Sequence, residues 1–522
     1  LFSNASLFGG TISASYIRNA FGEITTITDP NSNNWLLGYD NMGRTTSSTD
    51  PLANVQTISY DNRNRPATVT FPGALGSLSL GFDPAGNLTS NSYSDGTTFN
   101  LVYDANDHLI SADGLTLTHD ANDRIIDSNG IITVRDVGER ITSMMLATGK
   151  SVVYAYDAND NLVSVTDWVG GVTTFSYDDA GKLIGITRPN GINATISYDN
   201  DSRLTDLTEG ASSISLTRDA KGQITNAVRS VPQSASSYGL SSATRSVDAA
   251  SQLTSATYDE LGRTTSEGSN SYSWNLASHL TSMSTASGTT TATYDAMGNR
   301  LSRTTAGSTR SYSWNYAFGL PSISIEQQDG SDLRYYVHTP GGALLYSVDA
   351  VTNARNFYHY DEMGNTLFVT NDAGSEIGSY AYSPYGQLIA ETGALDNPFT
   401  WQGQYGIMDE ADGLYYIRAR YYDANTGRFI SRDPVRSVHP MKINPYQYVW
   451  FNLPSRYLDL TNKFELEYQG LSGRELANYL NDSNEKNICI LANPLHVVKP
   501  FLNTKNFNCF DIWQKIDTNY KR

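Results

Sequence analysis

Short stretches of alternating apolar and polar residues run along most of the chain, and turn-forming residues separate them. Thr195-Ile196-Ser197-Tyr198 alternates in this way, which is typical of a strand with one buried face. Lys182-Leu183-Ile184-Gly185-Ile186 re-enters a strand directly after a turn. Signals for helices are almost absent before residue 460. The pattern therefore predicts an all-β fold, a long array of antiparallel β-hairpins.

The alternating stretches belong to a repeated unit that reads aromatic-Asp-x-x-Gly-(Arg/Asn/Lys)-Leu-x-(Ser/Thr). Good copies are Tyr39-Asp40 to Gly43-Arg44, Phe82-Asp83 to Gly86-Asn87, Tyr177-Asp178 to Gly181-Lys182, Tyr258-Asp259 to Gly262-Arg263, Tyr294-Asp295 to Gly298-Asn299 and Tyr360-Asp361 to Gly364-Asn365. Degenerate copies keep the frame, as at His119-Asp120 and Trp274-Asn275. The aspartates at positions 136, 157, 178 and 199 are 21 residues apart, and the step shortens to 16 between 104, 120 and 136. This period is too short for a propeller blade of ~40 residues and fits one hairpin per unit.

Turn chemistry explains the fixed positions of the unit. The aspartate can accept a hydrogen bond from a backbone N–H a little further along the chain and so start a turn. Glycine three residues later supplies a positive φ, and Asn or Asp is the next best choice there. Asn106, Asp107, Asn122, Asp123 and Asn159 meet this requirement in the degenerate copies.

A hairpin array must also bury its apolar face and protect its edges. One hairpin cannot do this alone, so neighbouring units stack, and stability becomes a sum of unit and interface contributions. With no helices to cover it, so long a sheet is expected to curl on itself. The pattern is compatible with a solid core of two packed sheets. A hollow shell cannot be derived from the pattern alone.

Two ligand hypotheses compete with this structural interpretation. Asp157-x-Asn159-x-Asn161 imitates the start of a calcium-binding loop, but Leu162 stands where that loop needs Gly, and its twelfth position has no Glu. The chain also has 34 Tyr, which could stack on sugars. We favour turn chemistry for the first feature and packing within the sheet for the second, and we expect no cofactor and no metal.

Charge and cysteine content narrow the function classes. A net charge of −17 disfavours broad binding of nucleic acid by the repeats. Cys489 and Cys509 are the two cysteines, so the first 488 residues have no disulfide framework. No apolar run approaches the ~20 residues of a membrane span. The chain begins with Leu1, which we interpret as a fragment or a processed form whose export signal is missing.

A longer signature between residues 355 and 434 carries a family resemblance. It runs through Tyr360-Asp361-Glu362-Met363-Gly364-Asn365, Tyr382-Ser383-Pro384-Tyr385-Gly386, Trp401-Gln402-Gly403-Gln404-Tyr405, Gly413-Leu414-Tyr415-Tyr416-Ile417-Arg418-Ala419-Arg420-Tyr421-Tyr422-Asp423 and Gly427-Arg428-Phe429-Ile430-Ser431-Arg432-Asp433-Pro434. This resembles the RHS repeat-associated core domain of RHS toxins, wall-associated toxins, toxin-complex C subunits and teneurins. The resemblance implies a sheet that spirals into a cocoon, with the core plugging one end. It also implies a variable C-terminal segment, usually a toxin, held inside as cargo.

In the toxin-complex relatives the core is an aspartyl protease that cuts itself. Two carboxylates that share a proton can activate water for such a reaction. The resemblance places one catalytic residue at Asp433, next to Arg432, and the other at Asp459. Leu460, Asn462 and Lys463 depart from the family's cut-site sequence, so two structural aspartates that end the core are the competing interpretation.

Composition changes abruptly at about residue 460. Residues 1–459 hold four lysines and residues 460–522 hold six. Ser472-Gly473-Arg474-Glu475 is a capping box that predicts a helix over the following residues. We therefore divide the chain into a repeat array (1–354), a core (355–459) and a small, partly helical tail (460–522). His496 and Asp511 could serve a hydrolase, but no partner motif accompanies them, and the tail's activity is not readable.

These observations favour a secreted or cell-surface toxin shell whose main partner is its own C-terminal segment. Secretion machinery and an immunity protein are the further partners that the resemblance implies. The alternative is a structural or adhesive surface protein whose array binds carbohydrate or another partner. Protection of residues 460–522 from protease separates the two hypotheses. A conventional enzyme within the repeats has little support, because no phosphate loop, nucleophile elbow or zinc-ligand pair occurs there.

Overall fold

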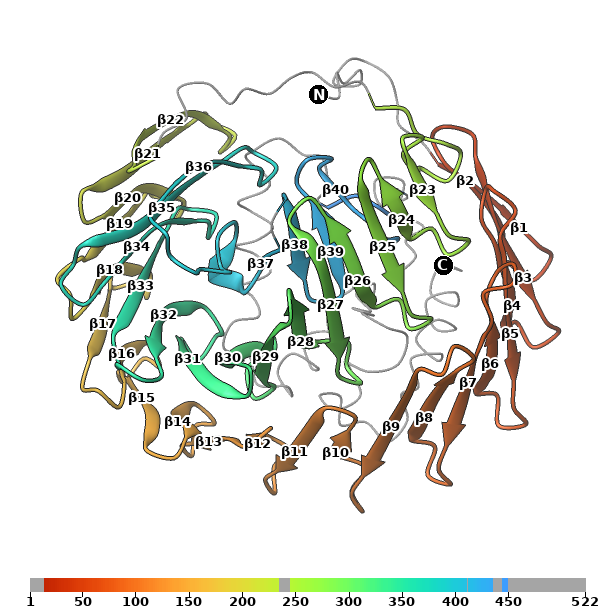
Figure 1. The fold of residues 1–522 in the computed structure, drawn as a ribbon, viewed down its shortest axis with the longest axis horizontal. Coiled ribbons are helices and arrows are strands. Elements are labelled where there is room, and N and C mark those ends of the chain that lie inside the picture. Colours follow the sequence, from red (N-terminus) through yellow and green to blue (C-terminus); the bar gives the residue numbers. More distant parts are fainter. Residues whose placement is uncertain (1–13, 234–244, 411, 435–443, 449–522) are drawn as a thin grey trace.

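A computed structural model of the chain describes residues 14–233, 245–410, 412–434 and 444–448 (Figure 1). Within this part the chain forms 40 β-strands and a single 3-10 helix, η1 (Gly403–Tyr405), which confirms the all-β prediction. No helix in the described ranges has the length and apolar character needed to cross a bilayer. The capping box at residues 472–475 and the helix that it predicts lie outside the described residues.

The first 22 strands form one sheet, which we call the outer turn. Its strands are β1 (Ser15–Arg18), β2 (Ile24–Thr28), β3 (Asn34–Tyr39), β4 (Thr45–Thr49), β5 (Val55–Tyr60), β6 (Pro66–Thr70), β7 (Ser77–Phe82), β8 (Leu88–Tyr93), β9 (Thr98–Tyr103), β10 (Leu109–Ala112), β11 (Leu115–His119), β12 (Ile125–Ser128), β13 (Ile131–Arg135), β14 (Ile141–Ala147), β15 (Lys150–Tyr156), β16 (Leu162–Thr166), β17 (Val172–Tyr177), β18 (Leu183–Thr187), β19 (Ala194–Tyr198), β20 (Leu204–Glu209), β21 (Ser212–Arg218) and β22 (Ile224–Ser230).

A second sheet of 14 strands forms the inner turn. It contains β23 (Ala256–Tyr258), β24 (Thr264–Glu267), β25 (Asn270–Trp274), β26 (Leu280–Thr285), β27 (Gly288–Tyr294), β28 (Arg300–Thr305), β29 (Ser308–Asn315), β30 (Ser322–Gln328), β31 (Ser331–His338), β32 (Leu344–Asp349), β33 (Arg355–Tyr360), β34 (Thr366–Thr370), β35 (Glu376–Tyr382) and β36 (Leu388–Thr392). The remaining described residues, 393–410, 412–434 and 444–448, form the plug. Its four-stranded sheet consists of β37 (Met408–Asp409), β38 (Leu414–Ile417), β39 (Arg420–Asp423) and β40 (Arg428–Phe429).

Each repeat unit folds as a hairpin, as its period predicts, and the turn uses the predicted chemistry. Asp178 Oδ1 accepts hydrogen bonds from the backbone N–H groups of Ala180 and Lys182 at 3.0 and 2.9 Å, and Gly181 has φ +77°. In the degenerate copies Asp107 and Asp123 take the positive φ. The prediction was wrong for Asn106, Asn122 and Asn159. Asp160 takes the left-handed conformation, because the third residue after the aspartate must do so.

In many units the tyrosine links its hairpin to the one before. Tyr198 Oη donates to the carbonyl oxygen of Leu183 at 2.9 Å, and Tyr177 Oη donates to that of Leu162 at 2.9 Å, in each case 15 residues earlier. The cation at the end of a turn covers the next unit's ring: Lys182 Nζ lies 5.4 Å from the centroid of Tyr198. The aromatic-Asp motif therefore ties neighbouring hairpins together as well as closing each turn.

The strip spirals, so that the outer turn surrounds the inner turn and the plug lies inside both (Figure 1). Along the middle of the outer turn, contacts between the two turns join residues at similar separations, and the separation shortens near its end, where Glu209 meets His359 150 residues later. Asp95 meets Leu276 181 residues later, Ser128 meets Trp314 186 residues later, and Asp167 meets Arg355 188 residues later. Units about nine periods apart therefore pack face to face. This arrangement is the packed two-sheet core with which the repeat pattern was compatible.

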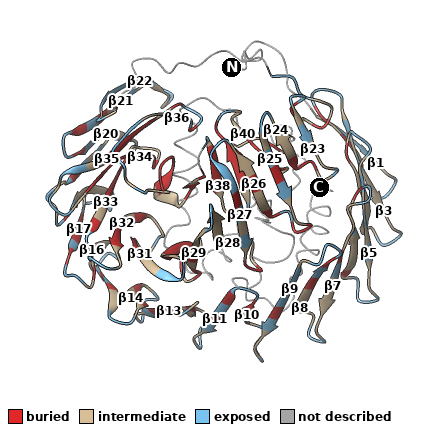
Figure 2. Cartoon of the chain, viewed as in Figure 1, coloured by how far each residue is buried: buried red, intermediate tan, exposed pale blue. Residues whose placement is uncertain are grey.

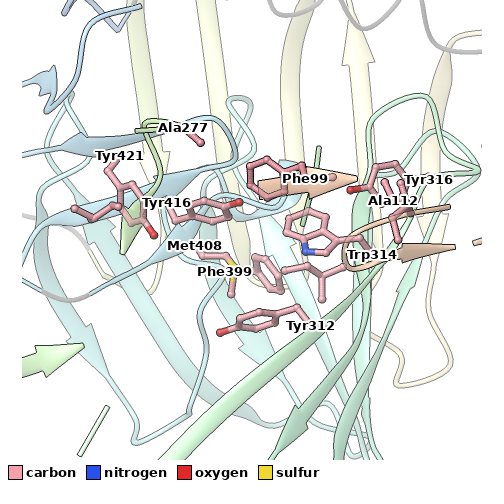
Figure 3. Close-up of a cluster of buried hydrophobic side chains, with 14 of the residues drawn as sticks. Phe99, Ala112, Ala277, Tyr312, Trp314, Tyr316, Phe399, Met408, Tyr416 and Tyr421 are labelled. Carbon is pink, nitrogen blue, oxygen red and sulfur yellow. The ribbon is translucent and has the colours of Figure 1, made fainter. Parts of the chain in front are cut away.

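Three layers meet in the largest hydrophobic cluster, part of which is drawn in Figure 3. Phe99 comes from the outer turn, Trp314 from the inner turn, and Met408 and Tyr416 from the plug. Figure 2 shows buried residues gathered in the inner turn and plug, while exposed residues are frequent along the outer turn. Part of the inner turn, such as β34, is thus buried on both faces, and the three layers pack tightly in this cluster.

Candidate functional site: the end of the plug

The Arg-Asp-Pro segment that sequence reasoning selected follows β40 and ends the described range at residue 434. The chain returns beside it at residues 444–448. The backbone N–H of Phe429 donates to the carbonyl oxygen of Tyr446 at 3.0 Å, and that of Asp433 donates to Pro445 at 2.8 Å. Two strand-like segments therefore hold Asp433 in place through backbone bonds.

Asp433 is a partly exposed carboxylate, with 38% of its side-chain surface accessible. Its Oδ2 lies 3.2 Å from Nη2 of Arg420, whose guanidinium sits 3.5 Å from the centroid of the Phe429 ring. Burial lowers the pKa of Arg420 to about 10, and the negative charge of Asp433 acts in the opposite direction. The second predicted catalytic residue, Asp459, lies outside the described residues, so the Asp433–Asp459 pair stays a prediction.

Arg432 has a different partner, in the outer turn. Its Nη2 lies 2.7 Å from Oδ2 of the buried Asp50, and its guanidinium lies 5.5 Å from the ring of Trp35. Burial acts to lower the pKa of Arg432, but Tyr446 and Asp50 outweigh it and the pKa is raised. Sequence reasoning named Arg432 only as the neighbour of Asp433. Its pairing across 382 residues left no signal in the repeat pattern.

The same end of the plug also joins the first strands of the inner turn. Tyr446 Oη donates to the carbonyl oxygen of Gly262 at 2.7 Å, and the backbone N–H of Thr264 donates to Ile430 at 2.8 Å. Arg428 donates to the carbonyl oxygen of Ser251. The end of the plug, the start of the inner turn and the start of the outer turn thus converge around residues 428–434 and 444–446.

A buried ion pair fixes the other side of the plug. Arg300 of β28 and Glu410, just after β37, are both almost fully buried, and Arg300 Nη1 lies 2.5 Å from Glu410 Oε1. Burial acts against the charge of Arg300, but Glu410 reverses this and raises the arginine's pKa. A pair of this kind leaves an uncompensated buried charge when either partner is removed. It anchors the plug within the inner turn.

The described residues show no built metal site. No three His, Cys, Asp or Glu side chains converge there as ligands would. At the calcium-like stretch, the Asp157 carboxylate accepts backbone N–H groups of Asn159 and Asn161, each at 2.9 Å. Turn formation therefore accounts for this aspartate.

Comparisons with known proteins agree with this architecture. The RHS Repeat family model matches residues 18–55, 136–172 and 156–196, and the Teneurin YD-shell model matches residues 197–453. The crystal structure of TcdB2-TccC3 without its hypervariable C-terminal region superposes with a TM-score of 0.55 at 14% identity, covering 86% of this chain and 30% of that one. At this identity the likeness concerns the fold alone.

Sequence relatives match over shorter stretches. The tRNA3(Ser)-specific nuclease WapA of Bacillus spizizenii is 32% identical over 110 residues, 20% of this chain and 4% of the relative. Toxin protein Tse5 of Pseudomonas aeruginosa is 34% identical over 115 residues, 22% of this chain and 8% of the relative. Salivary gland surface protein 1 of Aedes aegypti is 35% identical over 133 residues, 24% and 3% of the two chains. The matches thus span less than a tenth of these relatives.

Proposed function

Because this chain belongs to the RHS/YD-repeat family, we propose that it forms the closing end of a shell that encloses a C-terminal effector and delivers it against other bacteria or a host. The effector in this proposal is the tail, residues 460–522, which follows the proposed core, residues 355–459. Relatives named as nucleases and toxins support the class of cargo. They do not assign its activity.

One observation carries the proposal: the last described residue, Tyr448, lies on the plug inside the spiral. Tyr448 packs on Trp401 and Tyr422 of the plug, with ring centroids 5.1 and 4.5 Å away. The inner and outer turns surround the plug (Figure 1). A segment that continues from Tyr448 therefore starts from within the spiral.

Limited proteolysis of the full chain tests enclosure. With a C-terminal epitope for detection, we expect residues 460–522 to survive in native buffer and to be cut once denaturant opens the spiral. A protease site inserted next to Val351, which is 85% exposed in the β32–β33 turn, is the accessible control. A tail digested as fast as that control contradicts enclosure.

Self-cleavage is a separate proposal, with Asp433 and Asp459 as the acid–base pair. The exposure of Asp433 supports it, because the carboxylate remains reachable. Denaturing gels of the purified chain should show a fragment of about 460 residues. We expect this fragment to be absent in Asp433→Asn. It should persist in the control Asp178→Asn, which makes the same change from Asp to Asn in a repeat turn. An uncut wild-type chain ends this proposal and leaves enclosure standing.

The adhesive alternative rests on the similarity to a relative named as a surface protein. It requires a tail that is accessible in the native chain. The proteolysis experiment therefore decides between the two functions.

A further inference from the structure

A cavity of about 860 Å³ lies between the inner turn and the plug. One wall is a face of three neighbouring strands, on which Arg303 pairs with Arg310 across β28 and β29, and Glu326 follows on β30. Glu391 of β36 and Asp412 of the turn before β38 also line the cavity. The cavity is thus open space bounded by ordered strands and turns.

The charges that line this cavity do not balance. Its lining includes two guanidinium groups and five carboxylates, those of Arg303, Arg310, Glu326, Glu391, Asp396, Asp409 and Asp412. Glu326 and Asp396 are compensated, because Arg310 pairs with both at 2.6 Å and Arg334 pairs with the same two carboxylates. Glu391 and Asp412 are both exposed. The surplus is therefore negative, and it suits a ligand with several positive charges.

The wall also offers a free sheet edge. Strand β36 is the last strand of the inner turn, and among the described residues it pairs only with β35. Leu388 and Glu391 of this strand, and Gln387 just before it, line the cavity. The unpaired N–H and C=O groups of such an edge can accept an extended peptide as an additional strand. An extended polypeptide therefore fits both the charge and the backbone of this wall.

The chain itself supplies a candidate close by. Tyr448 lies 5.1 Å from the ring of Trp401, which lies 5.2 Å from Tyr415, a residue of the cavity wall. Residues 449–522 begin at this point. From residue 486 onward they carry six basic residues and two acidic ones, namely Lys486, Lys499, Lys505, Lys515, Lys521 and Arg522 against Asp511 and Asp517.

We propose that this cavity is a docking site for the basic end of the chain, residues 486–522, which lies along β36 with its Lys and Arg side chains on Glu391 and Asp412. The inference rests on the enclosure proposed above. It adds that the cargo binds a defined surface on the inside of the shell, rather than being enclosed without a binding site.

Site-directed cross-linking tests the docking site. The natural cysteines, Cys489 and Cys509, both lie in the proposed ligand, so a single new cysteine reports its neighbourhood. With Gln328→Cys, a cavity-wall position that leaves Glu391 and Asp412 in place, and a short flexible bismaleimide, we expect about ten-fold more cross-linking to the tail than with Val351→Cys on the exposed turn, because docking raises the effective concentration. Equal yields from the two positions overturn the proposal.

A charge-reversal variant then tests recognition. With Gln328→Cys as the reporter in the cavity wall, Glu391→Lys combined with Asp412→Lys should reduce cross-linking to the tail to the level of the Val351→Cys control. Unchanged cross-linking in this variant overturns the role of charge. Protease protection, measured on the same samples, separates the two proposals. Protection without cross-linking overturns only the docking site, and loss of protection in the wild type overturns enclosure itself.

Discussion

The outer and inner turns are built from the same hairpin unit but bury it differently. Along β21 of the outer turn, buried residues alternate with more exposed ones, whereas all five residues of β34 in the inner turn are buried. The outer turn packs against one layer and faces solvent on the other side. The inner turn lies between the outer turn and the plug. Position in the spiral, rather than the motif, therefore sets how much each unit contributes to stability.

The largest expected contrast is in apolar packing. Trp314 of the inner turn is 1% exposed, and its Nε1 donates to the carbonyl oxygen of Arg300 at 2.8 Å (Figure 3). Trp314→Ala should lower the free energy of unfolding by about 3–5 kcal/mol. Val153→Ala, on the half-exposed outer face, should change it by less than about 0.5 kcal/mol. Equal losses in chemical denaturation would contradict the comparison.

Charge removal gives the next contrast. Asp167 and Asp178 both close repeat turns, but Asp167 also holds the buried Arg355 of the inner turn at 2.7 Å. Asparagine keeps the turn hydrogen bonds in either position. Asp167→Asn should cost about 2 kcal/mol, since it removes one of the two carboxylates that pair with the Arg355 guanidinium and leaves only Asp372. Asp178→Asn loses a partly exposed pair with Lys182 and should cost at most about 1 kcal/mol, measured by the same denaturation curves.

The contribution of a buried histidine to stability should change more with pH in the inner turn than in the outer turn. Burial lowers the pKa of His338 in β31 from 6.5 to about 3. Below pH 6.5 this imidazole is therefore protonated in the unfolded chain while it stays neutral in the folded chain. The stability advantage of wild type over His338→Gln should fall by about 2 kcal/mol between pH 7 and pH 5. His119 of the outer turn is only half-buried, so the corresponding change for His119→Gln should be smaller. A pH-independent difference for His338→Gln would be inconsistent with a neutral, buried imidazole.

The smallest contrast concerns the linking hydroxyl. Tyr360 and Tyr198 make the same hydrogen bond to the preceding hairpin, each at 2.9 Å, but Tyr360 is 7% exposed. Tyr360→Phe should cost about 1–2 kcal/mol, because the carbonyl of Leu344 loses its donor inside the structure. Tyr198→Phe should cost about 0.5 kcal/mol, since water can replace the hydroxyl. Thermal midpoints of the two variants provide the measurement.

Local features of the fold were predictable because their causes lie within one unit. Asp178, Gly181 and Lys182 form their turn through contacts no more than four residues apart. The preference for packing over sugar binding also fits. Among described tyrosines only Tyr16 and Tyr385 are more than about a third exposed, so the others have little free ring surface for a ligand.

The stacking of turns was not predictable, because nothing in a 21-residue pattern says which distant unit it will face. The pairings of Asp167 with Arg355 and of Asp50 with Arg432 depend on the radius of the spiral. The candidate site shows the same limit. Its motif located Asp433, but Arg420, the partner that holds this carboxylate, became visible only through the structure.

The separation of 181–188 residues at the contacts of Asp95, Ser128 and Asp167 has a consequence for how such a gene can change. Unequal crossing-over between neighbouring repeats would add or delete one unit of 21 residues, and every later unit would then face the wrong partner. Asp95, Ser128 and Asp167 would all lose their contacts together. Lineages of this protein should therefore tolerate many substitutions within units while preserving the number of units between facing layers.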